Sequence, residues 1–122
     1  MTKMVFIAHP MSGDIRGNTR RVEEICRSVH TLDVIPVFPS FVWRRYLKEV
    51  KKCGYQSSLA SRVNDEYFKR KFIDEVWLYG DRITNGMLAE ILLAWKYHIP
   101  VIGKTPETIR MLKQYEREYG RT

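Results

Sequence analysis

The chain has 122 residues, 44% of them hydrophobic and 29% charged, a balance typical of one folded domain with its own core. No apolar stretch approaches the roughly 20 residues of a membrane-spanning helix, and the start lacks a signal-peptide pattern, so we expect a cytoplasmic protein. The net charge is +7, mostly from residues 1–61, which favours anionic partners: phosphates, nucleotides or nucleic acid. The two cysteines form no metal-binding or disulfide pattern, and we expect no metal or cofactor.

The first part of the chain alternates strand-like and helix-like patterns. Residues 3–8 form a short apolar run that predicts a buried strand. Residues 18–31 predict a helix, with Asn18 as its N-cap and an apolar stripe at helical spacing. Residues 34–38 predict a second strand, and Pro36 suggests that it lies at a sheet edge.

The middle of the chain is less distinct than its C-terminal part. Residues 41–52 have helical spacing but fit an ordered loop equally well, and a helix is then predicted from Ser57 or Ser58 to about Lys71. The remaining pattern predicts a strand at 75–79, an apolar helix at 85–98, a strand at 100–103, and a last helix capped by Thr105 with Pro106 at its first position.

This alternation predicts the architecture. Strands that alternate with helices form a parallel sheet covered on both faces, because each crossover places a helix on one face. Right-handed crossovers favour a flavodoxin-like, doubly wound α/β fold with three α/β/α layers, about four strands and strand order 2-1-3-4. We expect residues 1–122 to form a single domain.

In such a sheet, ligands bind at the carboxyl ends of the strands where the strand order reverses, here between strands 1 and 3. The loop after strand 1 leads into a helix N-terminus, where unpaired N–H groups attract anions. Its glycines permit close approach of a ligand, and its polar side chains can bind phosphate or sugar. The alternative is a loop whose glycines only make turns. The candidate binding residues are His9, Ser12, Gly13, Arg16, Gly17 and Asn18.

Glu90 is the most informative single residue, because it is the only acid in the apolar helix predicted at 85–98. Gly86 and Ala94 lie four residues before and after it, and such small neighbours leave a groove above the carboxylate. A buried carboxylate is costly without a partner or a function. The structural alternative is that Glu90 reaches solvent or pairs with an arginine.

Other acids can reach the same place. Asp81 directly follows strand 3, and Asp65 and Glu66 lie on the preceding helix. Two carboxylates beside a sugar are the usual equipment for breaking a glycosidic bond, one of them as nucleophile. The spacing in the sequence permits this pairing without selecting it.

The sequence resembles the nucleoside 2-deoxyribosyltransferase-like family, in particular its small, mostly uncharacterised bacterial and phage branch. The resemblance spans about residues 4–103 and is most specific over 74–90. It is carried by Ile7-Ala8-His9-Pro10-Met11-Ser12-Gly13 with Asn18, by Asp74-Glu75-Val76-Trp77-Leu78-Tyr79-Gly80-Asp81-Arg82-Ile83-Thr84-Asn85-Gly86-Met87, by Ala89-Glu90-Ile91 and by Ile99-Pro100-Val101.

The resemblance implies a flavodoxin-like fold and an enzyme that cleaves or transfers at the N-glycosidic bond of a nucleoside or nucleotide. Glu90 would attack the anomeric carbon, and Glu66 or its neighbour Asp65 would be the second acid. The loop with Ser12, Gly13, Arg16 and Gly17 would hold a 5′-phosphate. Asp81 and Gly86 are further candidate binding residues from their positions after strand 3 and beside Glu90. The resemblance also implies a homodimer or larger assembly.

One departure opens an alternative. Many members have a strand-1 tyrosine whose hydroxyl orients the nucleophile, and this chain has Phe6 there, which removes a hydrogen bond worth about 1–3 kcal/mol. The alternative function is therefore a module that binds or sequesters a nucleotide-type ligand without chemistry. A further alternative is single-stranded nucleic acid on a basic and aromatic segment, set against a simple solvated face: Trp43, Arg44, Arg45, Tyr46, Lys48, Lys51 and Lys52.

Overall fold

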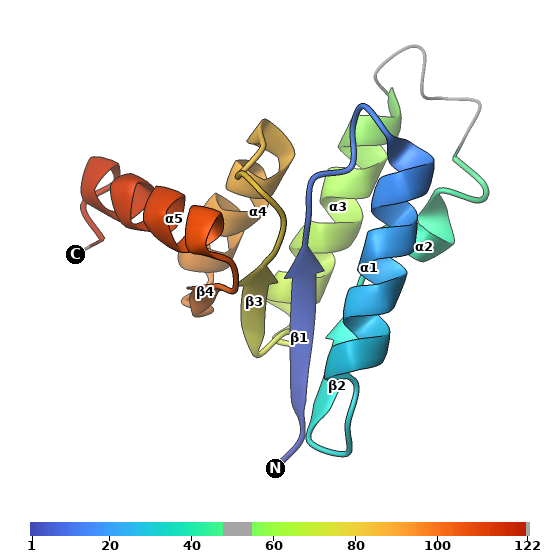
Figure 1. Cartoon of the computed structure of the whole chain (residues 1–122), viewed down its shortest axis with the longest axis horizontal. Coiled ribbons are helices and arrows are strands. Elements are labelled where there is room, and N and C mark those ends of the chain that lie inside the picture. The colour runs from blue at the N-terminus through green and yellow to red at the C-terminus, as the bar shows by residue number, and fades with distance from the viewer. Residues whose placement is uncertain (48–54, 122) are drawn as a thin grey trace.

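The computed structural model describes residues 1–47 and 55–121. Strands and helices alternate along most of the chain, as Figure 1 shows. In chain order the elements are β1 (Lys3–Ala8), α1 (Ile15–Val29), β2 (Val34–Val37), α2 (Ser40–Trp43), α3 (Tyr55–Lys69), β3 (Glu75–Leu78), α4 (Asn85–Lys96), β4 (Val101–Gly103) and α5 (Pro106–Glu118).

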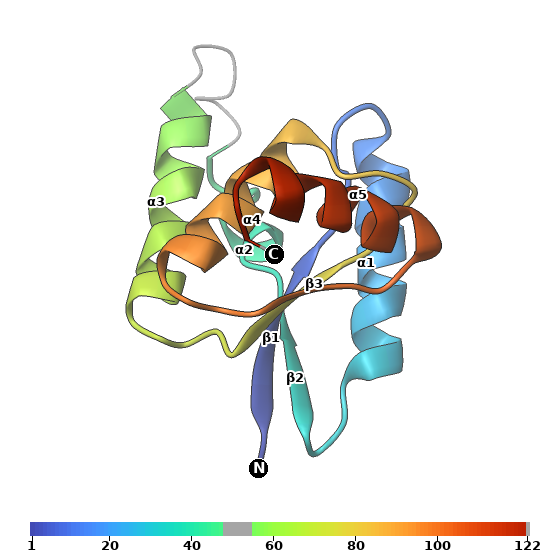
Figure 2. The same cartoon turned by 90° about the vertical axis from the view of Figure 1, so that its left-hand side faces the viewer.

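The four strands form one parallel sheet in the order β2-β1-β3-β4, which confirms the predicted topology. Pro36 lies in β2, which is an edge strand as predicted. A proline, which has no N–H to donate, is tolerated there because an edge strand has no neighbouring strand on its outer side. Figure 2 shows α1 and α3 on opposite sides of the strands, which gives the three layers of the predicted α/β/α fold.

Alternation along β1 divides the core between the two faces. Val5 and Ile7 point to one face and pack with Val22 of α1. Phe6 and Ala8 point to the other face, where they join a larger cluster contributed by α3, α4 and α5. Phe6 is 1% exposed and meets Phe68 of α3 edge-on, with ring centroids 5.1 Å apart.

Helix boundaries differ from the predictions in places. Helix α1 begins at Ile15, not Asn18, because the Asp14 side chain caps it by accepting a hydrogen bond from the Gly17 N–H. Helix α3 begins at Tyr55 and ends at Lys69. Of the segment predicted at 41–52, residues 41–43 are helical and residues 48–52 lie outside the described residues.

Candidate functional site

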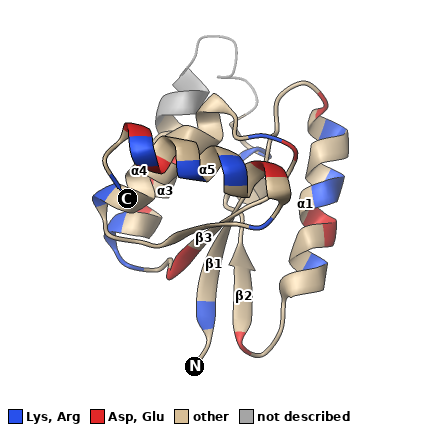
Figure 3. Cartoon of the chain, turned by 60° about the vertical axis from the view of Figure 1, so that its left-hand side comes forward, with Lys and Arg blue, Asp and Glu red and all other residues tan. Residues whose placement is uncertain are grey.

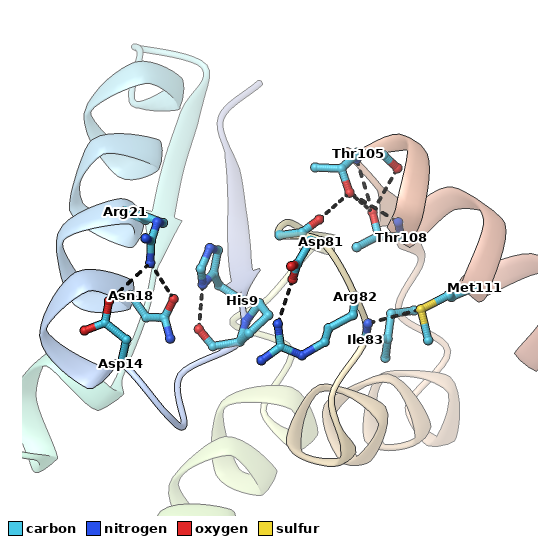
Figure 4. A network of polar contacts seen from close by, with 12 residues as sticks. His9, Asp14, Asn18, Arg21, Asp81, Arg82, Ile83, Thr105, Thr108 and Met111 are labelled. Atoms are coloured by element: carbon cyan, nitrogen blue, oxygen red, sulfur yellow. Dashed lines mark hydrogen bonds and ion pairs between the residues drawn. The ribbon is translucent and has the colours of Figure 1, made fainter.

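The loops that follow β1 and β3 meet at the carboxyl end of the sheet (Figure 4). The Tyr79 N–H donates to the Ala8 carbonyl at 2.9 Å, so the two strands stay paired up to the loops. Gly80 then adopts a φ of +99°, and a Cβ built on it would lie 2.5 Å from Cδ of Pro10. Glycine is thus required here both for conformation and for the close contact between the loops.

The N-cap and first turns of α5 contact the end of β3 and the loop that follows it. The Thr105 hydroxyl donates to the Gly80 carbonyl at 2.8 Å, and the Thr108 hydroxyl donates to the Leu78 carbonyl at 3.2 Å. The Ile83 N–H points at the sulfur of Met111 at 3.4 Å (Figure 4). Two of these contacts hold the loop, and the third holds the end of β3 from which the loop starts.

The larger of two neighbouring cavities at these loops has a volume of about 690 Å³, within the usual range of small-molecule sites. Glu90 is the only acid among the described residues that line it. The other lining residues come from β1 and its loop, from the segment after β2, from α2 and its C-cap, from α3, from the loop after β3 and from the start of α4: Phe6, His9, Met11, Ser12, Phe38, Pro39, Ser40, Trp43, Arg44, Asn64, Arg82, Ile83, Thr84, Asn85, Gly86 and Met87.

The Glu90 carboxyl lies where α4 faces this cavity. Glu90 is half-buried where it borders the open space, and desolvation by the surrounding protein raises the pKa of its carboxyl to about 8. The Asn64 amide on α3 is its hydrogen-bond partner, at a long 3.5 Å. Gly86 borders the same space, whereas Ala94 lies in the core, so the predicted groove opens on the Gly86 side alone.

The start of α4 is fixed by a side-chain cap. The Thr84 hydroxyl accepts a hydrogen bond from the Met87 N–H at 3.2 Å. Buried Met87 and Ile91 hold the helix against the sheet. The cap and the packing of α4 thereby fix the position of Glu90 at the cavity wall.

The second cavity, of about 530 Å³, lies between the two loops and shares three lining residues with the first: His9, Ser12 and Arg82. Its cationic groups are Arg21 of α1 and Arg82, which are half-exposed. Arg21 donates to the Asn18 side chain at 2.9 Å, and Arg82 donates to Asp81 at 2.7 Å (Figure 4). Asp14, 4.0 Å from the Arg21 guanidinium, and Asp81 line the same space, so each arginine is paired with a carboxylate there. A guanidinium has five N–H donors, and those beyond these contacts suit an anionic ligand group.

His9 lies at the junction of the two cavities and is 8% exposed. Its Nδ1 lies 2.6 Å from the Pro10 carbonyl, which can only accept, so Nδ1–H donates and Nε2 is left as an acceptor. Burial lowers the His9 pKa, and the charges of Arg21 and Arg82 add to this effect. A neutral ring is therefore favoured at neutral pH.

The structure brings together most of the binding residues predicted from sequence. Ser12 and His9 line both cavities, Gly86 lines the larger one, and Gly13, Asn18 and Asp81 line the smaller one. Arg16 and Gly17 line neither. Gly17 has a different role, since a Cβ there would overlap the Asp14 carboxylate that caps α1.

The two candidate second acids lie away from Glu90. Asp65 accepts a hydrogen bond from the Tyr97 hydroxyl at 2.9 Å. Glu66 pairs with Arg70 at 2.8 Å on a separate surface hollow, and this hydrogen bond lowers the pKa of its carboxyl. Asn64, one position earlier on α3, faces the cavity in their place.

Sequence reasoning did not single out Asn64, Arg82 or the α2 residues as lining the site. Arg82 had a usable signal, because it directly follows Asp81 in the loop after β3. Asn64 had none, because its place on α3 depends on how that helix is rotated against α4.

A family model described as a domain of unknown function, DUF7768, matches residues 3–104 of the chain. The chain belongs to this family. The matched range contains both loops and Glu90 and ends before α5. Comparison with curated proteins and with solved structures gives no significant match.

Among residues 1–47 and 55–121, no helix has the length and apolar character needed to cross a bilayer. The same part of the chain contains no group of three or more His, Cys, Asp or Glu side chains arranged to hold a metal ion.

Proposed function

We propose that the chain binds a nucleoside or nucleotide across the two cavities and cleaves its N-glycosidic bond, with Glu90 as the nucleophile. The observation that carries the proposal is the position of Glu90, the one acid among the described residues lining a cavity of about 690 Å³ that joins a cavity flanked by arginines. The resemblance to nucleoside 2-deoxyribosyltransferase-like proteins supports the same assignment.

In the proposed reaction, the ionised Glu90 carboxylate attacks the anomeric carbon as the C–N bond breaks and the bonding electrons leave with the base. Water or a second base then attacks the sugar and releases Glu90. Asn64 can donate a hydrogen bond but no acidic proton, so the departing base takes its proton from solvent. Arg21, Arg82 and Ser12 bind the phosphate when the substrate is a nucleotide.

The test is a screen for base release from a panel of nucleosides and 5′-monophosphates, with and without an acceptor base. Glu90→Gln keeps size and hydrogen bonding but removes the nucleophile, so we expect base release to fall by about 10³-fold or more. Glu23→Gln on the exposed side of α1 is the matched control and should retain wild-type activity. No base release by the wild-type protein across the panel would refute the proposal.

A second candidate function is binding of the same ligand without chemistry. It is favoured by Phe6, which supplies no hydroxyl to the cavity, and by Asn64 where a second acid was expected. Tight binding in calorimetry with the ligand recovered unchanged would separate this function from the first.

Nucleic-acid binding by the segment from Trp43 onward gains little support from the described residues. Arg44 turns into the larger cavity, while Arg45 and Tyr46 are exposed. Lys48, Lys51 and Lys52 lie outside the described residues. Figure 3 shows that Lys and Arg on α1 and α5 are interspersed with acidic positions.

The resemblance also leads us to propose a homodimer or larger assembly. Sedimentation of the purified chain over a range of concentrations tests this proposal, and a monomer at every concentration would contradict it.

A further inference from the structure

The wall of the larger cavity formed by α2 contains two buried polar atoms that the proposed reaction does not use. They are Oγ of Ser40 and Nε of Arg44, and neither has a hydrogen-bond partner among the residues that the structure describes. Both residues line the Glu90 cavity. Buried polar atoms are nearly always paired, so two orphans on one wall of a cavity point to a group that enters it.

The setting of Arg44 supports the same conclusion. Its guanidinium lies 5.2 Å from the ring centroid of Trp43, which lines the same cavity. Burial lowers the pKa of Arg44, yet a guanidinium stays charged at any physiological pH. Within residues 1–47 and 55–121, no acid forms an ion pair with it. A half-buried cation beside an aromatic ring is thus available to an anion.

We propose that Ser40 and Arg44 form a subsite for an anionic oxygen group, a phosphate or a carboxylate, at the α2 wall of the larger cavity. This inference rests on one part of the proposed function, namely that the larger cavity is the ligand site. The Arg44 Nε–H donates to one oxygen and the Ser40 hydroxyl donates to the same or a neighbouring oxygen, which satisfies both orphans.

This subsite differs from the phosphate position between the loops after β1 and β3. Arg82 borders both cavities from the loop after β3, whereas Arg44 enters the larger one from α2. The anionic group can come from a second acidic group of the nucleotide itself or from a separate free anion. Both sources have the same chemistry, and competition between ligands distinguishes them.

The experiment follows the three tryptophan indole N–H signals by NMR during titration with inorganic phosphate. The Trp43 signal is assigned from Trp43→Phe, and we expect it to shift saturably. In Arg44→Met the apparent affinity for phosphate, measured from the shift of the Trp43 signal, should fall by about 10-fold or more. Arg45→Met is the matched control, because Arg45 is exposed and does not line the cavity, and it should change affinity less than about 2-fold.

Ser40→Ala is the second variant, since it removes one donor with little effect on packing. We expect it to weaken phosphate binding at Trp43 by several-fold while the thermal unfolding midpoint stays near that of wild type. A Trp43 signal that does not respond to phosphate, or a response that is equal in wild type, Ser40→Ala and Arg44→Met, would overturn the subsite.

Two further titrations identify the source of the anion and separate the subsite from the proposed function. A deoxynucleoside 5′-diphosphate that displaces phosphate from Trp43, where the 5′-monophosphate does not, supports a subsite for the nucleotide's own second acidic group, whereas joint occupancy of the diphosphate and phosphate supports one for a free anion. Glu90→Gln should leave the phosphate response intact. Phosphate binding without base release therefore refutes only the function, and base release without an Arg44-dependent response refutes only the subsite.

Discussion

At neutral pH the carboxyl of Glu90 is mostly protonated, because burial raises its pKa to about 8. A nucleophile has to be ionised, so the active fraction at pH 7 is only about one tenth. The pKa of this one side chain therefore sets the pH range in which the proposed enzyme works.

The first prediction concerns the pH dependence of the rate. Base release should increase about 10-fold per pH unit below the pKa of Glu90 and level off above about pH 8. Initial rates at subsaturating substrate, measured from about pH 5.5 to about pH 9.5, report this pKa in the free protein. A rate that is flat or falls with rising pH over this range would exclude ionised Glu90 as the nucleophile.

The second prediction concerns stability. Between about pH 4.5 and about pH 8, native Glu90 holds a proton that the unfolded chain has released, so the free energy of unfolding falls as the pH rises. The loss is complete above the native pKa and can reach a few kcal/mol, at ~1.4 kcal/mol per pKa unit.

Urea unfolding at several pH values, compared between wild type and Glu90→Gln, measures this contribution. The difference in unfolding free energy should shift in favour of the variant as the pH rises through this range, because glutamine has no proton to release. Parallel pH profiles for the two proteins would show that Glu90 has an ordinary pKa.

At the scale of elements, α5 matters most for the shape of the site. It lies beyond the matched range of residues 3–104, yet Thr108 binds the end of β3 and Thr105, its N-cap, binds Gly80 in the loop that follows. A helix far from Glu90 in the sequence thus supports the loop that carries Asp81 and Arg82.

Thr105→Val should loosen this support. The change removes both the N-cap of α5 and the hydrogen bond to the Gly80 carbonyl, with an expected loss of about 1–2 kcal/mol of unfolding free energy. Amide hydrogen exchange at residues 80–83 should also become faster. Thr19→Val is the control, because its hydroxyl bonds only to a carbonyl of its own helix. Equal exchange in both variants would contradict the role of α5.

Element order and strand order could be predicted because apolar runs and caps are local signals, and crossover handedness leaves few topologies. The first turn of α1 was missed because Asp14, Ile15 and Gly17 read as loop residues, whereas Asp14 in fact caps the helix. The helical spacing over 41–52 includes residues 41–43 of α2, but spacing does not show that this helix forms a wall of the cavity, because that depends on how α2 packs.

The second acid of the site could not be predicted correctly either, because its position depends on packing. Spacing indicates which residues share the helix α3, but it does not set the rotation of α3 about its axis when it packs on α4. That rotation turns Asn64 toward Glu90 and leaves Asp65 bound to Tyr97. Glu90 itself was predictable, because a single acid in an apolar helix stands out without any knowledge of packing.

At the scale of the whole molecule, the net charge of +7 acts on any anionic ligand before contact. Binding of a deoxynucleoside 5′-monophosphate should weaken several-fold between about 0.05 M and about 0.5 M NaCl, because salt screens the field and the exposed arginines. The matching uncharged nucleoside should bind with nearly constant affinity. Calorimetry with both ligands tests this, and equal salt dependence would show that the phosphate does not contact the arginines.

The close contact of Gly80 with Pro10 has a consequence for the thermodynamics of binding. Because Gly80 of the loop after β3 lies against Pro10 and its carbonyl accepts a hydrogen bond from Thr105, the contacts that order these loops come from the chain itself, and their conformational entropy is lost during folding. An arriving ligand does not have to order them. Most of the free energy of its contacts with these loops is then expressed as affinity, as in a preorganised receptor.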